Sequence, residues 1–180
     1  MEITLVFPHQ LFEHHPGIRA NRSIALMADG LILGGDPQST LTIHPRKFEL
    51  HQQSKLAYKK LLESKGHSVL TLTPNSQQQT SDLLNQLIDS GYQTFYLADP
   101  VDDLLTKRVR KTLQQRSCVL EILPTPMLLT PTKVMDDYFN GRRKPMMVHF
   151  YQMQRKRLGV LIDDQGAPVG GRWSFDADNR

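Results

Sequence analysis

Short apolar runs alternate with longer amphipathic segments along this chain. The runs at 3–7, 23–27, 69–72, 94–97 and 118–123 are rich in branched residues and bounded by polar residues, Gly or Pro. Runs of this kind are typical of parallel strands that are buried on both faces of a sheet. The pattern therefore predicts about five strands.

Between these runs, apolar residues recur at helical spacing. Segment 46–65 is predicted to be an amphipathic helix that stops at Gly66. Ser81 is expected to cap a second helix, which Gly91 ends, and Asp99-Pro100 to open a third. The apolar residues that show this spacing in the first helix are Leu50, Ala57, Leu61 and Leu62.

Alternation of strands and helices implies right-handed crossovers and a parallel sheet covered on both faces. The prediction is a doubly wound, Rossmann-like α/β domain over residues 1–125. Thr130-Pro131 and Pro145 each start a further helix, so residues 126–160 are expected to form C-terminal helices that pack on that domain. The Asp-, Gly- and Pro-rich tail, 161–180, is interpreted as a linker toward a domain that these residues lack.

Composition narrows the class of protein. A chain of 180 residues can bury a full core without disulfide or metal support. Its one cysteine, Cys118, lies in an apolar run and is expected to be a buried hydrophobe, which fits a reducing cytoplasm. No signal-peptide pattern or run of 18 apolar residues occurs, so we expect a cytoplasmic protein with no membrane contact.

Several common chemistries lack their sequence patterns. The chain has no G-x-G-x-x-G after its first strand, no phosphate-binding G-x-x-x-x-G-K-[ST] loop and no G-x-S-x-G elbow. His9, Glu13, His14 and His15 match no metal-ligand spacing, and we interpret the histidines as solvated loop residues. We therefore name no catalytic residue and no metal ligand.

The candidate binding residues follow predicted strands, where open α/β sheets hold ligands. His9 and Gln10 follow the first strand and Asp29 the second. His44, Lys47 and His51 are three and four residues apart and share one helical face. A surface turn and an exposed polar face are the alternatives for these two groups.

A second group of candidates lies in the C-terminal third. Arg142, Arg143 and Lys144, followed by Arg155 and Arg157, make the densest basic region. Such a region contacts phosphates, complements helix dipoles or binds another domain. The aromatic and basic residues expected at an interdomain or nucleic-acid contact are Arg142, Arg143, Phe150, Tyr151, Arg155, Arg172, Trp173 and Phe175.

Three segments resemble a known family. They are 7–12 (Phe-Pro-His-Gln-Leu-Phe), 35–54 (Gly35-Asp36-Pro37-Gln38 through Ser54) and 147–180, which contains Gly170-Gly171-Arg172-Trp173-Ser174-Phe175-Asp176-Ala177-Asp178-Asn179-Arg180. The chain resembles the N-terminal domain of the deoxyribodipyrimidine photolyase-related proteins, the iron–sulfur bacterial branch of the cryptochrome and photolyase family. The family usually has an aspartate where this chain has His9.

This resemblance implies an antenna-type α/β domain that holds a lumazine-type chromophore. It further implies a helical partner domain, in cis or in trans, that holds FAD and a four-iron cluster, and light-driven repair of (6-4) photoproducts in DNA by the two together. One cysteine cannot supply four thiolates, so flavin, cluster and lesion pocket are not expected in these residues.

Three functions are compatible with the sequence. In the first, the chromophore contacts His9, Gln10, Asp29, His44 and Lys47 in a pocket of roughly 300 Å³ or more. In the second, the chain is a non-catalytic module that docks a helical flavoprotein through an exposed apolar patch near its C-terminus. In the third, its basic region binds nucleic acid independently, whereas the resemblance implies DNA contact only through the full-length protein.

Overall fold

The computed structural model describes residues 1–39, 42–75 and 78–175. The chain forms two compact units, Met1–Leu129 and Thr130–Arg180, which are described separately below. The first unit ends at residue 129, beyond the predicted end of the α/β domain at 125. Residues Asp176 to Arg180, which close the family-like C-terminal segment, lie outside the described residues.

The first unit contains one five-stranded, all-parallel sheet, which confirms the predicted α/β class. Its strand order is β3-β2-β1-β4-β5. Because β1 lies between β2 and β4, the chain builds outward from β1 in two directions, and the switch point lies between β1 and β4. The strands are β1 (Glu2–Val6), β2 (Ser23–Met27), β3 (Val69–Leu72), β4 (Thr94–Ala98) and β5 (Val119–Leu123).

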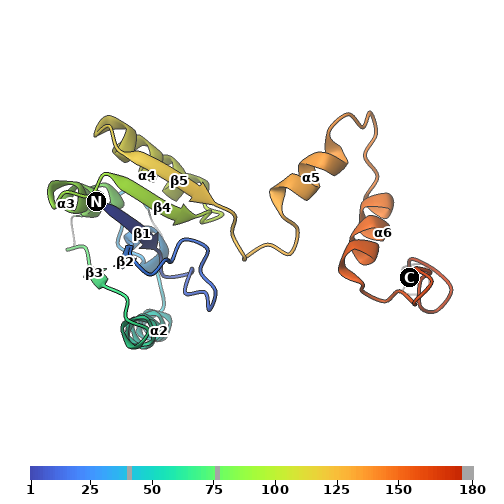
Figure 1. Cartoon of the computed structure of the whole chain (residues 1–180), viewed down its shortest axis with the longest axis horizontal. Coiled ribbons are helices and arrows are strands. Elements are labelled where there is room, and N and C mark those ends of the chain that lie inside the picture. The colour runs from blue at the N-terminus through green and yellow to red at the C-terminus, as the bar shows by residue number, and fades with distance from the viewer. Residues whose placement is uncertain (40–41, 76–77, 176–180) are drawn as a thin grey trace. The chain divides into compact units, whose positions relative to one another are not determined.

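Three long helices of the first unit connect or flank these strands, as Figure 1 shows. The connection between β1 and β2 is a loop with no helix, so the alternation of strand and helix begins only after β2. The helices of both units are α1 (Gly30–Leu33), α2 (Pro45–Ser64), α3 (Thr80–Asp89), α4 (Asp103–Gln115), α5 (Thr132–Phe139) and α6 (Met147–Leu158).

The two faces of the sheet are covered unequally. On one face, α3 and α4 pack their leucines against side chains of β1, β2 and β4, including Ile3, Met27 and Phe95. On the other face, only Tyr58 and Leu62 of α2 reach the core, where they pack on β1 and β2. The edge strand β5 is consequently partly open, and its Val119 is 52% exposed.

Two predicted helix starts are wrong. The helix expected at Asp99-Pro100 begins at Asp103, because Asp99 accepts the N–H of Val101 in a turn of its own and Val101 adopts a φ of 55°, outside the helical region. Asp102 caps the helix instead, through the N–H of Leu105 at 2.7 Å. Ser81 is likewise not a cap, since α3 already begins at Thr80.

The apolar stripe that predicted α2 divides between the core and the surface. Leu62 is buried, but Leu50 is 63% exposed, Leu61 is 42% exposed and Ala57 is exposed. Tyr58 takes their place in the core. The helical spacing was correct, but the helix presents most of that stripe to a surface groove instead of the sheet.

The second unit is a small helical region around three aromatic rings. Tyr138 and Phe139 of α5 pack with Phe150 of α6, with ring centroids 4.9 to 5.3 Å apart. The Tyr138 hydroxyl donates to the carbonyl of Met146 at 2.9 Å, which fixes the start of α6 against α5. Phe150 therefore serves the interior of this unit.

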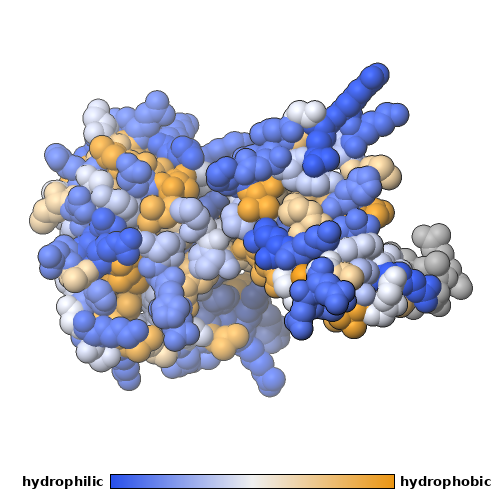
Figure 2. Space-filling view, turned by 45° about the vertical axis from the view of Figure 1, so that its right-hand side comes forward, coloured by the Kyte–Doolittle hydropathy of each residue, from blue (hydrophilic) through white to orange (hydrophobic). Residues whose placement is uncertain are grey.

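The structure tests the predictions that Cys118 is buried and that the chain has no membrane span. Cys118 is only partly buried, because it precedes the open edge strand, although it packs against the core. None of the helices in the described ranges combines the length and the apolar character that a membrane span requires. Figure 2 shows hydrophobic side chains breaking the visible, mostly hydrophilic face in several small groups.

Candidate functional site

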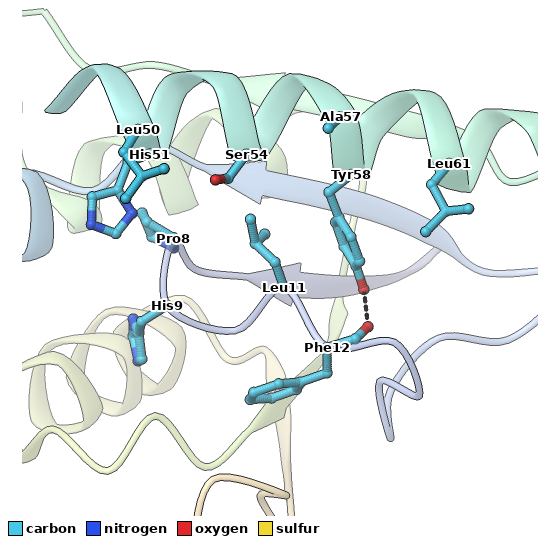
Figure 3. A pocket seen from close by; sticks show the side chains of 10 residues that line it. All are labelled: Pro8, His9, Leu11, Phe12, Leu50, His51, Ser54, Ala57, Tyr58 and Leu61. Atoms are coloured by element: carbon cyan, nitrogen blue, oxygen red, sulfur yellow. Dashed lines mark hydrogen bonds between the residues drawn. The ribbon is translucent and has the colours of Figure 1, made fainter. Parts of the chain in front are cut away.

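A groove of about 610 Å³ lies between the segment that follows β1 and one side of α2. Figure 3 shows its ten lining side chains, six from α2 on one wall and four from the segment after β1 opposite them. Its apolar lining is Pro8, Leu11, Phe12, Leu50, Ala57 and Leu61. Its polar lining is His9, His51, Ser54 and Tyr58. The exposed stripe of α2 is thus one wall of this groove.

Gln10 fixes the segment that forms the opposite wall. It is fully buried, its Nε2 donates to the carbonyl of Ala98 at 2.8 Å, and its Oε1 accepts the N–H of Phe7 at 3.4 Å. Both ends of the amide are therefore used in tying the exit of β1 to the exit of β4. This predicted binding residue holds the switch point together and does not line the groove.

His9 lies beside that clamp and does line the groove. Its Nε2 is 3.1 Å from the carbonyl oxygen of Pro100, so a neutral ring donates its proton there. Its Nδ1 is buried and, within the described part of the chain, has no hydrogen-bond partner. Burial lowers the pKa of His9, which keeps the ring neutral and leaves Nδ1 as an acceptor.

The α2 wall contributes a second imidazole and two hydroxyls. His51 is half-buried and close enough to His9 to lower its pKa further by charge repulsion. The Tyr58 hydroxyl donates to the carbonyl of Phe12 at 2.8 Å, the bond drawn in Figure 3. That bond ties α2 to the loop after β1, so the groove has two braced walls.

The groove combines flat apolar walls with a few polar atoms at one end. Sites for small organic ligands have this composition: apolar contacts provide affinity and sparse polar groups fix orientation. Its volume falls within the range of such sites, about 300 to 1,000 Å³. The arrangement therefore suits a small organic molecule that has apolar surface and a few polar atoms.

Asp29, the third candidate after a strand, lies elsewhere in a closed polar network. It is fully buried, caps α1 through the N–H of Leu31 at 2.9 Å and accepts the hydroxyl of Thr80 at 2.6 Å. Burial raises the pKa of Asp29, opposed by these two hydrogen bonds. Both carboxylate oxygens are used within the fold, which gives Asp29 a structural role here.

The same network contains a buried ion pair that sequence reasoning missed. Arg108 of α4 binds Asp36 through two contacts of 2.5 and 3.2 Å and also reaches Thr80 and Gln38. Burial opposes ionisation of Asp36, but the bonds and charge of Arg108 outweigh it and lower the pKa of that carboxyl. The only signal in the sequence was a basic residue among the buried positions of a helix.

His44 and Lys47 are not brought to the groove. His44 is the exposed N-cap of α2, where its Nδ1 accepts the N–H of Arg46 at 3.2 Å, and Lys47 is exposed one turn later. Of the three residues predicted to share a face of this helix, only His51 lines the groove. Of the six predicted binding residues, the structure brings together two, His9 and His51.

The predicted contact residues of the second unit divide into interior and surface groups. Arg155 is 5% exposed, and its three guanidinium nitrogens donate to the carbonyls of Val160, Leu161 and Trp173. Arg142 donates to the carbonyl of Tyr138 and stacks on that ring. The residues that remain exposed are Arg142, Arg143, Tyr151, Arg172 and Phe175, with Trp173 half-buried.

One loop histidine is not solvated as predicted. His15 is 6% exposed, stacks on Phe12 and accepts the N–H of Gly17 through Nδ1 at 3.1 Å. Burial lowers its pKa to about 4. The described residues contain no group of three His, Cys, Asp or Glu side chains that could hold a metal ion.

Comparison with known proteins supports the resemblance seen in the sequence. A family model described as "Deoxyribodipyrimidine photo-lyase-related protein" matches residues 4–180. The chain is 24% identical over 186 residues to "Uncharacterized protein R852" of Acanthamoeba polyphaga mimivirus, covering 99% of this chain and 93% of the relative. It is 48% identical over 40 residues to the (6-4) photolyase of Agrobacterium fabrum (strain C58 / ATCC 33970), covering 22% of this chain and 8% of that protein.

Proposed function

This chain belongs to the family of deoxyribodipyrimidine photolyase-related proteins, and we propose that its first unit is an antenna-type domain that binds a planar heteroaromatic chromophore in the groove between β1 and α2. The bound chromophore, a ribityllumazine in this proposal, passes excitation to a flavin held by a separate helical domain. In this proposal, light-driven DNA repair or light sensing requires both domains, and the first unit contributes the antenna.

The groove is the observation that carries the proposal. Leu50 and Leu61 of α2 are exposed apolar side chains that a ring system would cover, which gives a hydrophobic gain on binding. His9 and His51 offer polar atoms at one end of the same groove. The site lies at the carboxyl end of β1, where open parallel sheets bind their ligands.

The second unit supports the scaffold part of the proposal. Met147, Val148 and Phe175 are 67%, 54% and 42% exposed, and all three line a hollow of about 450 Å³. Exposed apolar surface of this kind is typical of protein contacts. Docking a helical flavoprotein is therefore the second candidate function, and it does not require a chromophore. Because Arg155 is buried, the basic surface available for nucleic acid is smaller than the sequence suggested.

The test is retention of a ribityllumazine by the purified chain. We expect the wild-type protein to keep a near-ultraviolet or violet absorption band through gel filtration. Ala57→Trp fills the groove from an exposed position of α2, so it should weaken binding at least tenfold without unfolding the helix. Removing a polar group with His51→Ala should weaken it by a smaller factor.

Lys60→Trp is the matched control, because it adds the same ring to an exposed position of α2 outside the groove. It should retain the band, and circular dichroism should show equal helix content in all variants. A band lost equally in Lys60→Trp and Ala57→Trp would remove the groove from the proposal. No retained band in the wild-type protein would reject the antenna function and leave docking.

A further inference from the structure

A second hollow, of about 410 Å³, lies on the first unit beside the groove between the segment after β1 and α2. The two share Tyr58 and Leu61 in their linings. Unlike the groove, this hollow is lined largely by ionisable residues. They are Glu13, His14, His15, Arg19, Lys65 and His67. We propose that this hollow is an anion site that takes a phosphate group.

Two of its lining residues carry positive charge that the protein does not neutralise. Among the residues that the structure describes, neither Arg19 nor Lys65 forms an ion pair. Arg19 makes one long contact, 3.4 Å, with the carbonyl of Ile18. Glu13 is the single carboxylate in the lining, so the hollow keeps an excess of positive charge. Such a concave cationic site concentrates anions.

A buried, unused hydrogen-bond donor points to the same ligand class. Nδ1 of His15 accepts the N–H of Gly17, so the neutral ring carries its proton on Nε2. That Nε2 is buried and has no partner within the described ranges. A buried donor without an acceptor destabilises the folded protein. Phosphate oxygens are strong acceptors and would relieve this destabilisation.

The loop holds His15 rigidly in place. The carbonyl of Gly17 accepts both the hydroxyl of Thr4 at 2.7 Å and the guanidinium of Arg22 at 2.8 Å. A Cβ at Gly17 would lie 2.9 Å from Cγ2 of Thr4, so only glycine fits this approach. His15 is therefore held by a tightly packed turn, whereas Arg19 and Lys65 are exposed.

The phosphate has two chemical sources, and the experiment separates them. One is free inorganic phosphate. The other is a phosphate ester at the end of a ligand whose ring lies in the neighbouring groove, an alternative that rests on the proposed function. Tyr58 and Lys65 are seven residues apart on α2 and its C-cap, about 10 Å of helix axis, which a sugar-alcohol chain can bridge.

The first arm titrates the whole chain with sodium phosphate at constant ionic strength, adjusted with chloride, and follows the ring nitrogens of His15 by NMR. We expect a saturable shift of Nε2 that chloride does not produce. Lys65→Gln and Arg19→Gln should each weaken phosphate binding at least threefold. Lys60→Gln removes the same charge from α2 outside the hollow and should leave binding unchanged.

The second arm compares riboflavin with riboflavin 5′-phosphate. A preference of at least tenfold for the phosphorylated molecule, lost in Lys65→Gln and kept in Lys60→Gln, would assign the hollow to the tail of a groove ligand. No phosphate shift in the first arm together with no preference in the second would overturn the proposal. Failure of both flavins to bind would reject a flavin phosphate as the source, and the phosphate titration alone would then decide whether the hollow binds anions.

Discussion

The polar side chains near the carboxyl edge of the sheet differ sharply between its two faces. On the side of α4, Asp29, Asp36, Thr80 and Arg108 satisfy one another and are buried. On the side of α2, His9 has a buried ring nitrogen with no partner among the described residues. The polar groups of the first set form hydrogen bonds to one another within the fold. His9, in contrast, keeps a ring nitrogen that can accept a hydrogen bond from a ligand.

Whether a buried polar group has a partner distinguishes residues that stabilise the fold from residues that can bind a ligand better than the residue type does. Asp29 and His9 both follow strands and both were candidates for binding, yet only His9 lines a groove. Buried polar groups in proteins nearly always have partners, so an orphan next to an open groove is informative. The comparison can be tested by breaking each side in turn.

Arg108→Met should have the largest effect, on stability. It removes the cation that pairs with the buried Asp36, and breaking a buried ion pair from one side costs about 3 to 5 kcal/mol. Urea unfolding measures the loss. Arg110→Met on the exposed side of α4 is the control and should stay within about 0.5 kcal/mol of wild type. Equal losses in the two variants would show that the network does not stabilise the fold.

Acidification should act on the α2 side through His15. Its pKa is lowered from 6.5 to about 4 in the folded protein, so the unfolded chain binds the proton first as the pH falls. The free energy of unfolding should therefore decrease between pH 6.5 and 4, by up to about 3 kcal/mol at about 1.4 kcal/mol per pKa unit.

The His15 contribution is obtained by difference. Urea unfolding across this pH range should give a steeper slope for wild type than for His15→Gln. Subtraction removes the contributions of Asp36 and His9, whose pKa values are also lowered, and of Asp29, whose raised pKa acts in the opposite direction. Parallel slopes in the two proteins would contradict burial of a neutral His15.

Gln10→Leu should cost about 1 to 3 kcal/mol, because it leaves the buried N–H of Phe7 and the carbonyl of Ala98 without their partner. Thermal or urea unfolding measures it. If Gln10 were a ligand residue in place of a clamp, the loss would fall on binding of the ribityllumazine and the stability would hardly change.

His9→Leu should have the smallest effect on stability, below about 1 kcal/mol, since it removes one half-buried hydrogen bond and an unpartnered nitrogen. Its effect should instead appear as weaker retention of the ribityllumazine. His9→Leu would then weaken binding with little loss of stability, whereas Gln10→Leu would lower stability. A large loss of stability with unchanged binding would place His9 with the structural set.

Local patterns were sufficient for the architecture. The strand at Ser23–Met27 and the strand at Val69–Leu72 lie where short apolar runs predicted them, and the all-parallel sheet follows from their alternation with helices after residue 30. The start of α4 was not predictable, because the turn at Asp99 competes with the helix cap through the same type of side chain. The family, too, was recognised from the sequence, and the match over residues 4–180 confirms it.

The sequence by itself determined the strands, most of the helices and the residue types near the sheet edge, because these depend on periodicity and on neighbours along the chain. Only the tertiary structure decided how those residues are used. Leu61 and Leu62 are neighbours in one apolar stretch of α2, but only the packing of α2 on the sheet shows that Leu61 is a groove wall and Leu62 is core. Likewise Arg108 pairs with Asp36, which lies 72 residues away in the sequence, and patterns of neighbouring residues do not predict such a pair.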